Sequence, residues 1–151
     1  MSKSMNVLNE LLVDLFNDIL TIEQNAIQSG EFKDLSVTEM HTIEAIGMYT
    51  QKTMSEVANE LNITVGTLTI AINNLVKKGY VQRSKSEKDR RIVQISLTKR
   101  GKLAYRIHSK FHSDMIKETI SGLTDEEEEV LITSLEKLNK FFKEKYHLKK
   151  D

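Results

Sequence analysis

The chain has 151 residues with no cysteine and no proline, and its 22 basic residues balance its 22 acidic ones. The lack of cysteine excludes disulfides and every zinc site that uses thiolates, and it fits a reducing compartment such as the cytoplasm. No apolar run approaches the roughly 18 residues of a membrane span, and the first residues lack the apolar core of a secretory signal. We therefore expect one mainly helical domain, or two small lobes that share a core, without a membrane segment.

Two helices are predicted in the first third of the chain. Apolar residues recur every three or four positions through residues 6–29, which predicts an amphipathic helix that ends at Ser29-Gly30. After a connector, Ser36-Val-Thr-Glu39 has the spacing of a capping box. It predicts a second helix that runs to Gly47.

The next two predicted helices are short and close together. Thr53-Met-Ser-Glu56 is another capping box, and the helix that it opens stops near Asn62. Thr64 then caps a helix that runs to Lys78 and stops at Gly79. A short helix, a turn and a second helix are typical of a helix-turn-helix, whose second helix enters the major groove of DNA.

After this motif the periodicity changes to two. Val93, Ile95 and Leu97 alternate with polar residues, which predicts a half-buried strand, and residues 80–83 are its expected partner. Residues 84–91 form a polar, basic loop between the two strands. The sequence therefore predicts a β-hairpin directly after the helix-turn-helix.

Two more helices are predicted after the hairpin. Thr98 is the expected cap of a long helix from Lys99 to about Ser121, and Gly122 breaks it. Thr124-Asp-Glu-Glu127 opens a last helix. The predicted order is thus four helices, a hairpin and two helices.

Positive charge is concentrated around the hairpin. Residues 77–110 hold twelve Lys or Arg and two acidic residues, so this segment carries +10 while the other 117 residues carry −10. Solvated charge runs are common in proteins without a nucleic-acid partner, and so are helix-turn-helix patterns. A basic hairpin directly after the second helix of such a motif nevertheless favours double-stranded DNA as the partner.

The second helix of the motif offers mainly small, apolar and amide side chains to DNA. Gly66 allows a close approach, Val65 and Ile70 can touch thymine methyl groups, and Asn73 can pair with adenine. Because this helix has no Arg or Gln, we expect an A·T-rich site that is read partly through its shape. The candidate DNA contacts are Val65, Gly66, Thr67, Thr69, Ile70, Asn73, Lys77, Lys78, Lys85, Lys88, Arg90 and Arg91.

The tip of the hairpin has the size and charge to lie over a minor groove. Four of the candidate contacts, Lys85, Lys88, Arg90 and Arg91, lie in it. Asp89 is expected to pair with Arg91 or with a group on the preceding helix. Either pairing would fix the hairpin.

The run from Leu61 to Thr98 resembles the winged helix-turn-helix of the MarR family of transcriptional repressors. Ser86-Glu-Lys-Asp-Arg-Arg91 is similar to the wing signature of that family, and the likeness extends over the flanking helices. Ser86 and Lys88 stand where the family often has Asp and Arg, so we divide the minor-groove contact between Lys88 and Arg90. The resemblance implies six helices with a β-hairpin wing, and a homodimer on a pseudo-palindromic operator.

Within this family, the sequence is most similar to the FabT-type repressors of bacterial fatty-acid synthesis. The similar segments are residues 32–43, 63–69 and 99–112. They imply a cytoplasmic repressor of fatty-acid biosynthesis genes with long-chain acyl-acyl carrier protein as corepressor. Residues 1–35 and 99–151 would form the dimerisation region, and residues 36–98 the DNA-binding lobe.

The helix that begins at Lys99 offers surfaces for such a corepressor. Its basic face, Lys99, Lys102, Arg106 and Lys110, could dock the acidic carrier protein, although it could equally attract DNA phosphates or an acidic partner subunit. An acyl chain needs an apolar tunnel, and the side chains that could line one could also be plain core. The candidate ligand-binding residues are Ile22, Met40, His41, Ile43, His108, Phe111 and Met115, of which His41 and His108 are expected to link the pocket to the DNA-binding lobe.

A zinc-responsive repressor is the alternative function. His108 and His112 are four residues apart, so their imidazoles could share a metal. Together with Glu23 and His41 they resemble one site of the AdcR-type zinc repressors of the same family. The cysteine-containing companion site has no counterpart here, so we expect neither a metal nor a cofactor. The chain also lacks the nucleophile, phosphate-loop, dinucleotide and metalloprotease motifs of common enzymes, which favours a protein without catalytic activity.

Overall fold

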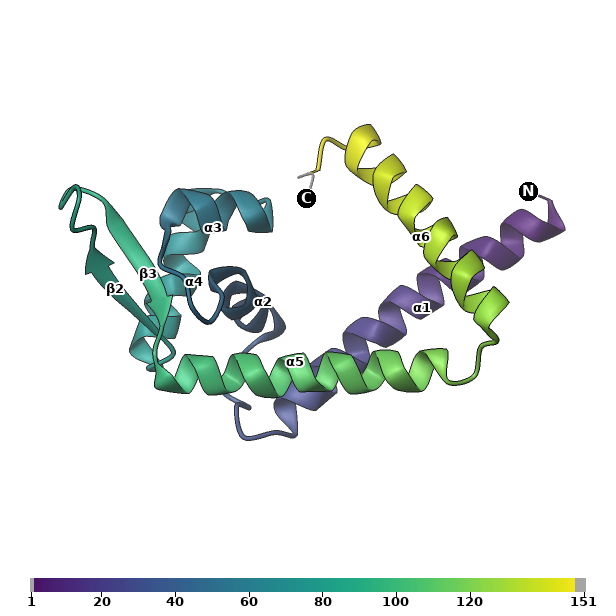
Figure 1. The fold of residues 1–151 in the computed structure, drawn as a ribbon, viewed down its shortest axis with the longest axis horizontal. Coiled ribbons are helices and arrows are strands. Elements are labelled where there is room, and N and C mark those ends of the chain that lie inside the picture. Colours follow the sequence, from purple (N-terminus) through teal and green to yellow (C-terminus); the bar gives the residue numbers. More distant parts are fainter. Residues whose placement is uncertain (1, 149–151) are drawn as a thin grey trace. The chain divides into compact units, whose positions relative to one another are not determined.

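Six helices and three short strands make up the computed structural model over its described residues, 2–148 (Figure 1). The chain forms two units, residues 1–40 and 41–151, and the boundary between them falls within α2 (Val37–Ile46). None of the helices in residues 2–148 combines the length and the apolar character of a membrane span. The predicted class, mainly α with a β-hairpin wing, is confirmed.

The first unit consists of one long helix and the start of the next. Helix α1 (Lys3–Gln28) begins three residues before the predicted start, because the Ser2 side chain accepts a hydrogen bond from the backbone N–H of Met5 at 3.3 Å. The capping box of α2 is confirmed: Ser36 Oγ and Glu39 Oε1 each accept a backbone N–H of the other residue, at 3.1 and 3.0 Å. Large apolar side chains along α1 are exposed to solvent, among them Leu8, Leu11, Leu15 and Phe16.

The predicted helix-turn-helix opens the second unit. It comprises α3 (Met54–Leu61) and α4 (Val65–Lys77), and threonines 53 and 64 cap the two helices as expected. Asn62 ends α3 in the left-handed conformation, with φ of +56°, which an Asn side chain tolerates. One side of α4 is anchored in the core by three fully buried residues, Leu68, Ile72 and Leu75.

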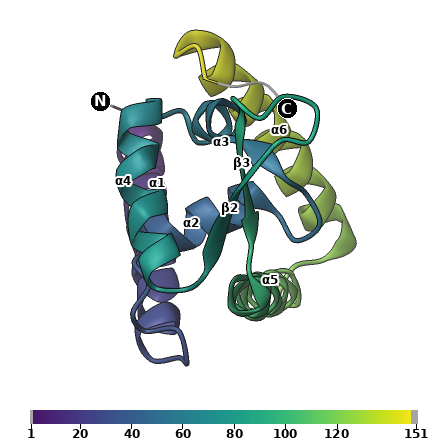
Figure 2. The ribbon, with the colours of Figure 1, turned by 90° about the vertical axis from the view of Figure 1, so that its left-hand side faces the viewer.

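The three strands form one antiparallel sheet with the strand order β1–β3–β2. Figure 2 shows β2 and β3 side by side. Strands β2 (Val81–Lys85) and β3 (Val93–Leu97) form the predicted hairpin, with Val81 opposite Leu97. The third strand, β1 (Lys52–Thr53), was not predicted. Two residues are too few to show an alternating pattern, so only their pairing with β3 reveals them as a strand.

Two long helices complete the second unit. Helix α5 (Lys99–Ile120) is capped by Thr98, and α6 (Asp125–Lys145) by the predicted Thr124–Glu127 capping box. Gly101 lets α5 begin directly against the chain that leaves α4, because a Cβ at this position would lie 2.1 Å from the carbonyl oxygen of Tyr80. Large apolar side chains on α6 are exposed: Val130, Leu131, Ile132, Leu135, Leu138, Phe141 and Phe142.

Candidate nucleic-acid interface

The exposed side of α4 is formed by side chains that were predicted to contact DNA. Val65, Gly66, Thr67, Ile70, Asn73 and Lys77 are exposed, and Thr69 and Lys78 are half-buried. The Thr69 hydroxyl donates to the Val65 carbonyl at 2.8 Å, so its proton is already engaged within the helix. Ile70 is 67% exposed, so its side chain is accessible to a partner on this side of α4.

One contact between α4 and the hairpin was missed in the sequence. Arg83 on β2 donates from Nη2 to Oδ1 of Asn73 on the exposed side of α4. The sequence shows only a basic residue in a strand, ten positions away from Asn73. Its partner depends on how the chain turns between α4 and β2.

A buried corner sets that turn. Gly79 adopts φ of +88°, which favours glycine, and Tyr80 is fully buried with its N–H donated to the Leu75 carbonyl at 2.9 Å. Thr98 closes the corner from the other side: its N–H bonds the Tyr80 carbonyl at 3.0 Å, and its hydroxyl bonds the Gly79 carbonyl at 2.6 Å. The Arg100 guanidinium lies 4.6 Å from the Tyr80 ring centroid and donates to the Tyr80 hydroxyl at 2.9 Å. The corner therefore ties the end of α4, the hairpin and the start of α5 together.

The tip of the hairpin is held by the predicted Asp89–Arg91 pair. Arg91 Nε and Nη2 each lie 3.0 Å from one carboxylate oxygen of Asp89, and the Arg91 N–H donates to the same carboxylate at 3.1 Å. These hydrogen bonds from Arg91 lower the pKa of Asp89, and the bond to Asp89 raises the pKa of Arg91. Of the two pairings considered, the one within the tip is confirmed.

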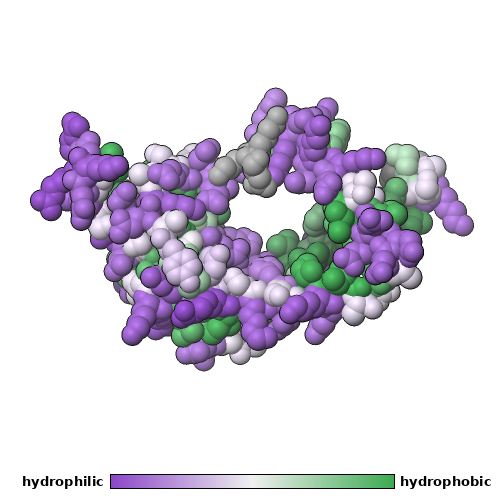
Figure 3. Space-filling model, in the orientation of Figure 1, coloured by the Kyte–Doolittle hydropathy of each residue, from purple (hydrophilic) through white to green (hydrophobic). Residues whose placement is uncertain are grey.

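This pairing leaves the cations of the tip in unequal situations. Arg91 uses two side-chain nitrogens in its pair with Asp89, whereas Lys85, Lys88 and Arg90 are exposed. Figure 3 shows the tip as a mostly hydrophilic projection. The tip can therefore offer positive charge to a polyanion while its own backbone stays fixed.

Helices α2 and α5 bring three ionisable side chains together. The Nε2 atom of His108 lies 2.9 Å from Glu44 Oε1 and 3.0 Å from His112 Nε2, and His112 Nε2 lies 3.7 Å from the same Glu44 oxygen. His108 is buried, with 3% of its surface exposed. Glu44 Oε1 is buried too, and within residues 2–148 it has no hydrogen bond of good geometry. We call Glu44, His108 and His112 the histidine cluster.

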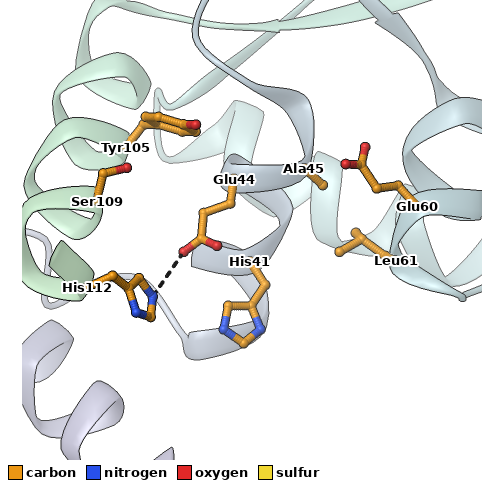
Figure 4. Close-up of a pocket in the computed structure, with 8 residues that line it drawn as sticks. All are labelled: His41, Glu44, Ala45, Glu60, Leu61, Tyr105, Ser109 and His112. Carbon is orange, nitrogen blue, oxygen red and sulfur yellow. Dashed lines mark ion pairs between the residues drawn. The ribbon is translucent and has the colours of Figure 1, made fainter. Parts of the chain in front are cut away.

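A pocket of about 600 Å³ opens beside this cluster (Figure 4). Figure 4 shows Tyr105, Ser109 and His112 projecting from α5 toward Glu44, with Glu60 and Leu61 on the opposite side. The residues that line the pocket are His41, Glu44, Ala45, Glu60, Leu61, Tyr105, Ser109 and His112. His41 is the one member of this set that was predicted to bind the ligand. Six of its eight lining residues carry polar or ionisable groups, whereas the tunnel predicted for an acyl chain is assigned to a mostly apolar set that shares His41 with this lining.

The other predicted ligand-binding residues lie elsewhere. Ile43 and His108 are buried in the second unit, where Phe111 and Met115 are half-buried. Ile22 is exposed on α1 and Met40 is buried. Glu44 was missed in the sequence because its place beside His108 depends on the packing of α2 against α5.

The basic face of α5 is present as predicted. Lys99, Arg106 and Lys110 are exposed and Lys102 is half-buried. Lys110 Nζ lies 2.6 Å from Asp114 Oδ2, and this hydrogen bond lowers the pKa of Asp114. The charge of Lys110 is thus partly neutralised within the helix, so the first three cations dominate the face.

The family model of the MarR family matches residues 35–93, which contain α2, the helix-turn-helix and most of the hairpin. FabT of Streptococcus pneumoniae, in a crystal structure of its complex with DNA, is 42% identical to this chain with a TM-score of 0.89. The match covers 93% of this chain and 98% of that one. The chain belongs to the MarR family.

Further similarities agree with this membership. The HTH-type transcriptional regulator SarZ of Staphylococcus haemolyticus is 32% identical over 102 residues, which is 68% of either chain. MepR of S. aureus, in a crystal structure of its complex with DNA, is 20% identical with a TM-score of 0.73, over 93% of this chain and 98% of that one. This second likeness shows the fold alone. The chain therefore has the winged helix-turn-helix fold. Its similarity to FabT, which was crystallised with DNA, and to the transcriptional regulator SarZ indicates a transcription regulator rather than an enzyme.

Proposed function

We propose that the protein is a sequence-specific repressor of fatty-acid biosynthesis genes, which binds DNA as a homodimer and uses long-chain acyl-acyl carrier protein as its corepressor. The observation that carries this proposal is the 42% identity to a FabT that was crystallised with DNA, over 93% of this chain. The chemistry of the exposed residues supports each part of it.

DNA binding is supported by the surface that α4 and the hairpin present together. Helix α4 exposes Ile70, Asn73 and Gly66, which suit the major groove. The hairpin tip carries Lys85, Lys88 and Arg90, which suit phosphates and a minor groove. We assign base readout to α4 and electrostatic affinity to the hairpin, with Thr67, Lys77 and Lys78 at the helix margins.

Homodimer formation is supported by apolar surface that a single chain leaves exposed. Leu11 of α1 is 60% exposed and Leu135 of α6 is 53% exposed, and each belongs to a row of similar side chains. Burying such rows stabilises an interface by about 25 cal/mol per Å² of apolar surface. We assign residues 1–35 and 99–151 to the dimer and 36–98 to the DNA-binding lobe, so that two lobes meet a pseudo-palindromic operator with half-sites about 34 Å apart.

The corepressor is assigned to α5 and to the apolar residues predicted to hold its acyl chain. The exposed cations Lys99 and Arg106, with the half-buried Lys102, suit the acidic surface of a carrier protein. The acyl chain requires apolar walls, for which Ile22, Met40, Ile43, Phe111 and Met115 are the candidates. Because Ile43 is fully buried, the chain would have to displace packed side chains, and so it would favour one arrangement of the lobes over another.

A mobility-shift assay tests the proposal. The probe is a palindrome-containing promoter of a fatty-acid biosynthesis gene, with a scrambled duplex of equal composition as the control. The promoter should be bound in preference to the scrambled duplex, and long-chain acyl-acyl carrier protein should strengthen binding while unacylated carrier protein does not. Equal binding to both duplexes would refute sequence-specific repression, and an identical effect of both carrier proteins would refute the corepressor.

The geometry of the histidine cluster favours a second candidate function, zinc-dependent regulation. Ligand atoms of a tetrahedral zinc site lie roughly 3.3 Å apart, since Zn–N and Zn–O bonds are about 2.0–2.2 Å long. The three atoms of the cluster are separated by 2.9, 3.0 and 3.7 Å. Within the second unit, this candidate keeps His108 and His112 of the predicted set of Glu23, His41, His108 and His112 and adds Glu44.

Calorimetric titration of chelator-treated protein with zinc tests this candidate. Glu44→Gln and His112→Ala should each weaken zinc binding by about tenfold or more if the cluster holds the ion. His147→Ala, at a histidine outside the cluster, is the matched control. Wild-type affinity in both cluster variants would exclude this zinc site.

A further inference from the structure

The contact between Arg83 and Asn73 joins strand β2 of the wing to the exposed side of α4, which we propose contacts DNA. Arg83 is exposed on β2, Asn73 is exposed on α4, and the Arg83 Nη2 group donates to Asn73 Oδ1. The corner at Gly79 and the fully buried Tyr80 turns β2 back alongside α4 and so sets the distance between the two side chains. The core therefore determines the orientation of this surface pair.

The chemistry of the pair fixes which way the amide points. A guanidinium has only donors, so the atom of Asn73 that faces Arg83 must be the carbonyl oxygen. The amide nitrogen then lies on the other branch of the side chain, with its two N–H donors directed away from the guanidinium. Arg83 thus fixes the orientation of the Asn73 amide, which would otherwise be free to turn either its oxygen or its nitrogen toward DNA.

This orientation changes what Asn73 can read. An asparagine that recognises adenine uses both ends of its amide, because Oδ1 accepts from N6 and Nδ2 donates to N7. Oδ1 has a second lone pair, but Arg83 holds this oxygen toward the wing, so the two N–H donors are the atoms of Asn73 better placed to meet the base edge. The acceptors in the major groove are N7 and O6 of guanine, O4 of thymine and N7 of adenine. Adenine N7 stands beside the N6 amino donor, which the amide nitrogen cannot accept from, so guanine and thymine match the donor end better.

We propose that Arg83 is a positioning residue that sets the base preference of Asn73, so that Asn73 donates to guanine or thymine in place of the bidentate pair with adenine predicted from the sequence. This inference rests on the proposed DNA-binding function. It assigns to Arg83 a part in specificity, whereas the cations of the wing tip contribute affinity.

The test measures base preference separately from affinity. Full-length wild-type protein first selects a duplex from a randomised palindromic pool, and a panel then carries each symmetric single-base substitution of that duplex. Fluorescence anisotropy gives the affinity of Arg83→Ala, Arg83→Lys, Asn73→Ala and the double alanine variant for every duplex. Lys85→Ala is the matched control, because Lys85 lies two residues along the same face of β2 without the contact to Asn73.

Arg83→Ala and Asn73→Ala should relax the preference at one shared position of each half-site by about fivefold or more, the size of one lost base contact. At that position wild type should prefer guanine or thymine, and the double variant should lose no more discrimination than Asn73→Ala alone. Arg83→Lys should show the same relaxation, because lysine keeps the charge but is one bond shorter and has no nitrogen in the place of Nη2. Lys85→Ala should weaken all duplexes by a similar factor.

Three outcomes would overturn the inference. One is a wild-type preference for adenine at the Asn73 position. Another is a failure of the Arg83 variants to relax the preference. Either Arg83→Ala would then lose affinity equally for every duplex, as Lys85→Ala does, or Arg83→Lys would keep the wild-type preference. If wild type selects no duplex from the pool, the proposed function fails as well, whereas the first two outcomes leave it standing.

Discussion

Helix α4 and the wing tip both face the proposed DNA, but they are built in different ways. The exposed side of α4 offers an isoleucine, an amide and a glycine on a helix whose other side is fixed by Leu68 and Ile72 in the core. The tip offers lysines and arginines on a polar loop, which is held by the Asp89–Arg91 ion pair and by backbone hydrogen bonds of Ile92 with Ser86 and Asp89. A rigid element with uncharged groups suits discrimination between bases, whereas exposed cations suit the phosphate backbone that every sequence shares.

Because α4 and the wing tip differ in this way, we expect the specificity and the affinity of DNA binding to be separable by substitution. Substitutions on α4 should change which duplex is preferred, and substitutions in the tip should change how tightly all duplexes are held. The two regions depend on each other at the Tyr80 corner and at the Arg83–Asn73 contact.

The largest effect should come from the corner that both regions share. In Gly101→Ala, the new Cβ would meet the Tyr80 carbonyl oxygen at 2.1 Å, so α5 must move away from the corner. We expect the free energy of unfolding to fall by about 1–3 kcal/mol, as for other overpacked sites, and DNA binding to weaken on all duplexes. Urea denaturation measures the first change. Gly122→Ala, where a Cβ meets nothing within 4 Å, is the control, and equal stability of the two variants would contradict the account of the corner.

The next effect concerns the tip alone. The triple variant Lys85→Ala, Lys88→Ala and Arg90→Ala should lower affinity for every duplex, and the slope of log affinity against log salt should decrease in magnitude by about 0.9 for each lost phosphate contact. Anisotropy over a series of salt concentrations gives the slope. Glu87→Gln, which removes an acidic charge from the same tip, should act in the opposite direction. An unchanged slope in the triple variant would remove the tip from the DNA interface.

A smaller effect is expected on α4. Ile70→Ala removes a 67% exposed side chain, so stability should change little, while preference for the selected duplex over a scrambled one should fall by about fivefold to tenfold. The salt slope should stay as in wild type. Asn74→Ala, at an exposed neighbour outside the proposed contacts, provides the comparison. If Ile70→Ala binds both duplexes as wild type does, α4 does not read the base edges in the way proposed.

The smallest effect involves the ion pair within the tip. Hydrogen bonds from Arg91 hold the pKa of Asp89 below its usual range. The pair is therefore intact above the ordinary pKa of an aspartate and is lost as the pH falls through the lowered pKa. DNA binding should therefore show no step from Asp89 between about pH 5 and 8. NMR titration of the Asp89 carboxyl should give a higher midpoint in Arg91→Gln than in wild type, and identical midpoints would show that the pair does not form in solution.

The parts of the molecule that were predicted from the sequence are those with local signals. Capping residues such as Thr64 and Thr124 mark helix starts within a few positions, and the alternation of Val93, Ile95 and Leu97 marks the strand. The Asp89–Arg91 pair was also predictable, since its members are two residues apart.

The parts that were missed depend on contacts between distant segments. Arg83 meets Asn73 only because a buried corner turns the chain back on itself. Glu44 lies 64 positions before His108 in the sequence, and no local spacing brings its oxygen to 2.9 Å from that imidazole. The pocket beside it likewise combines residues of α2, α3 and α5, which no local pattern in the sequence brings together.

One salt titration tests most directly whether α4 supplies specificity and the cations of the wing tip supply affinity. The affinity of the wild-type protein is measured for its selected duplex and for a scrambled duplex from low to physiological ionic strength. We expect both affinities to fall steeply in parallel, so that their ratio stays nearly constant. A flat response to salt, or a ratio that falls toward one as salt rises, would contradict the account.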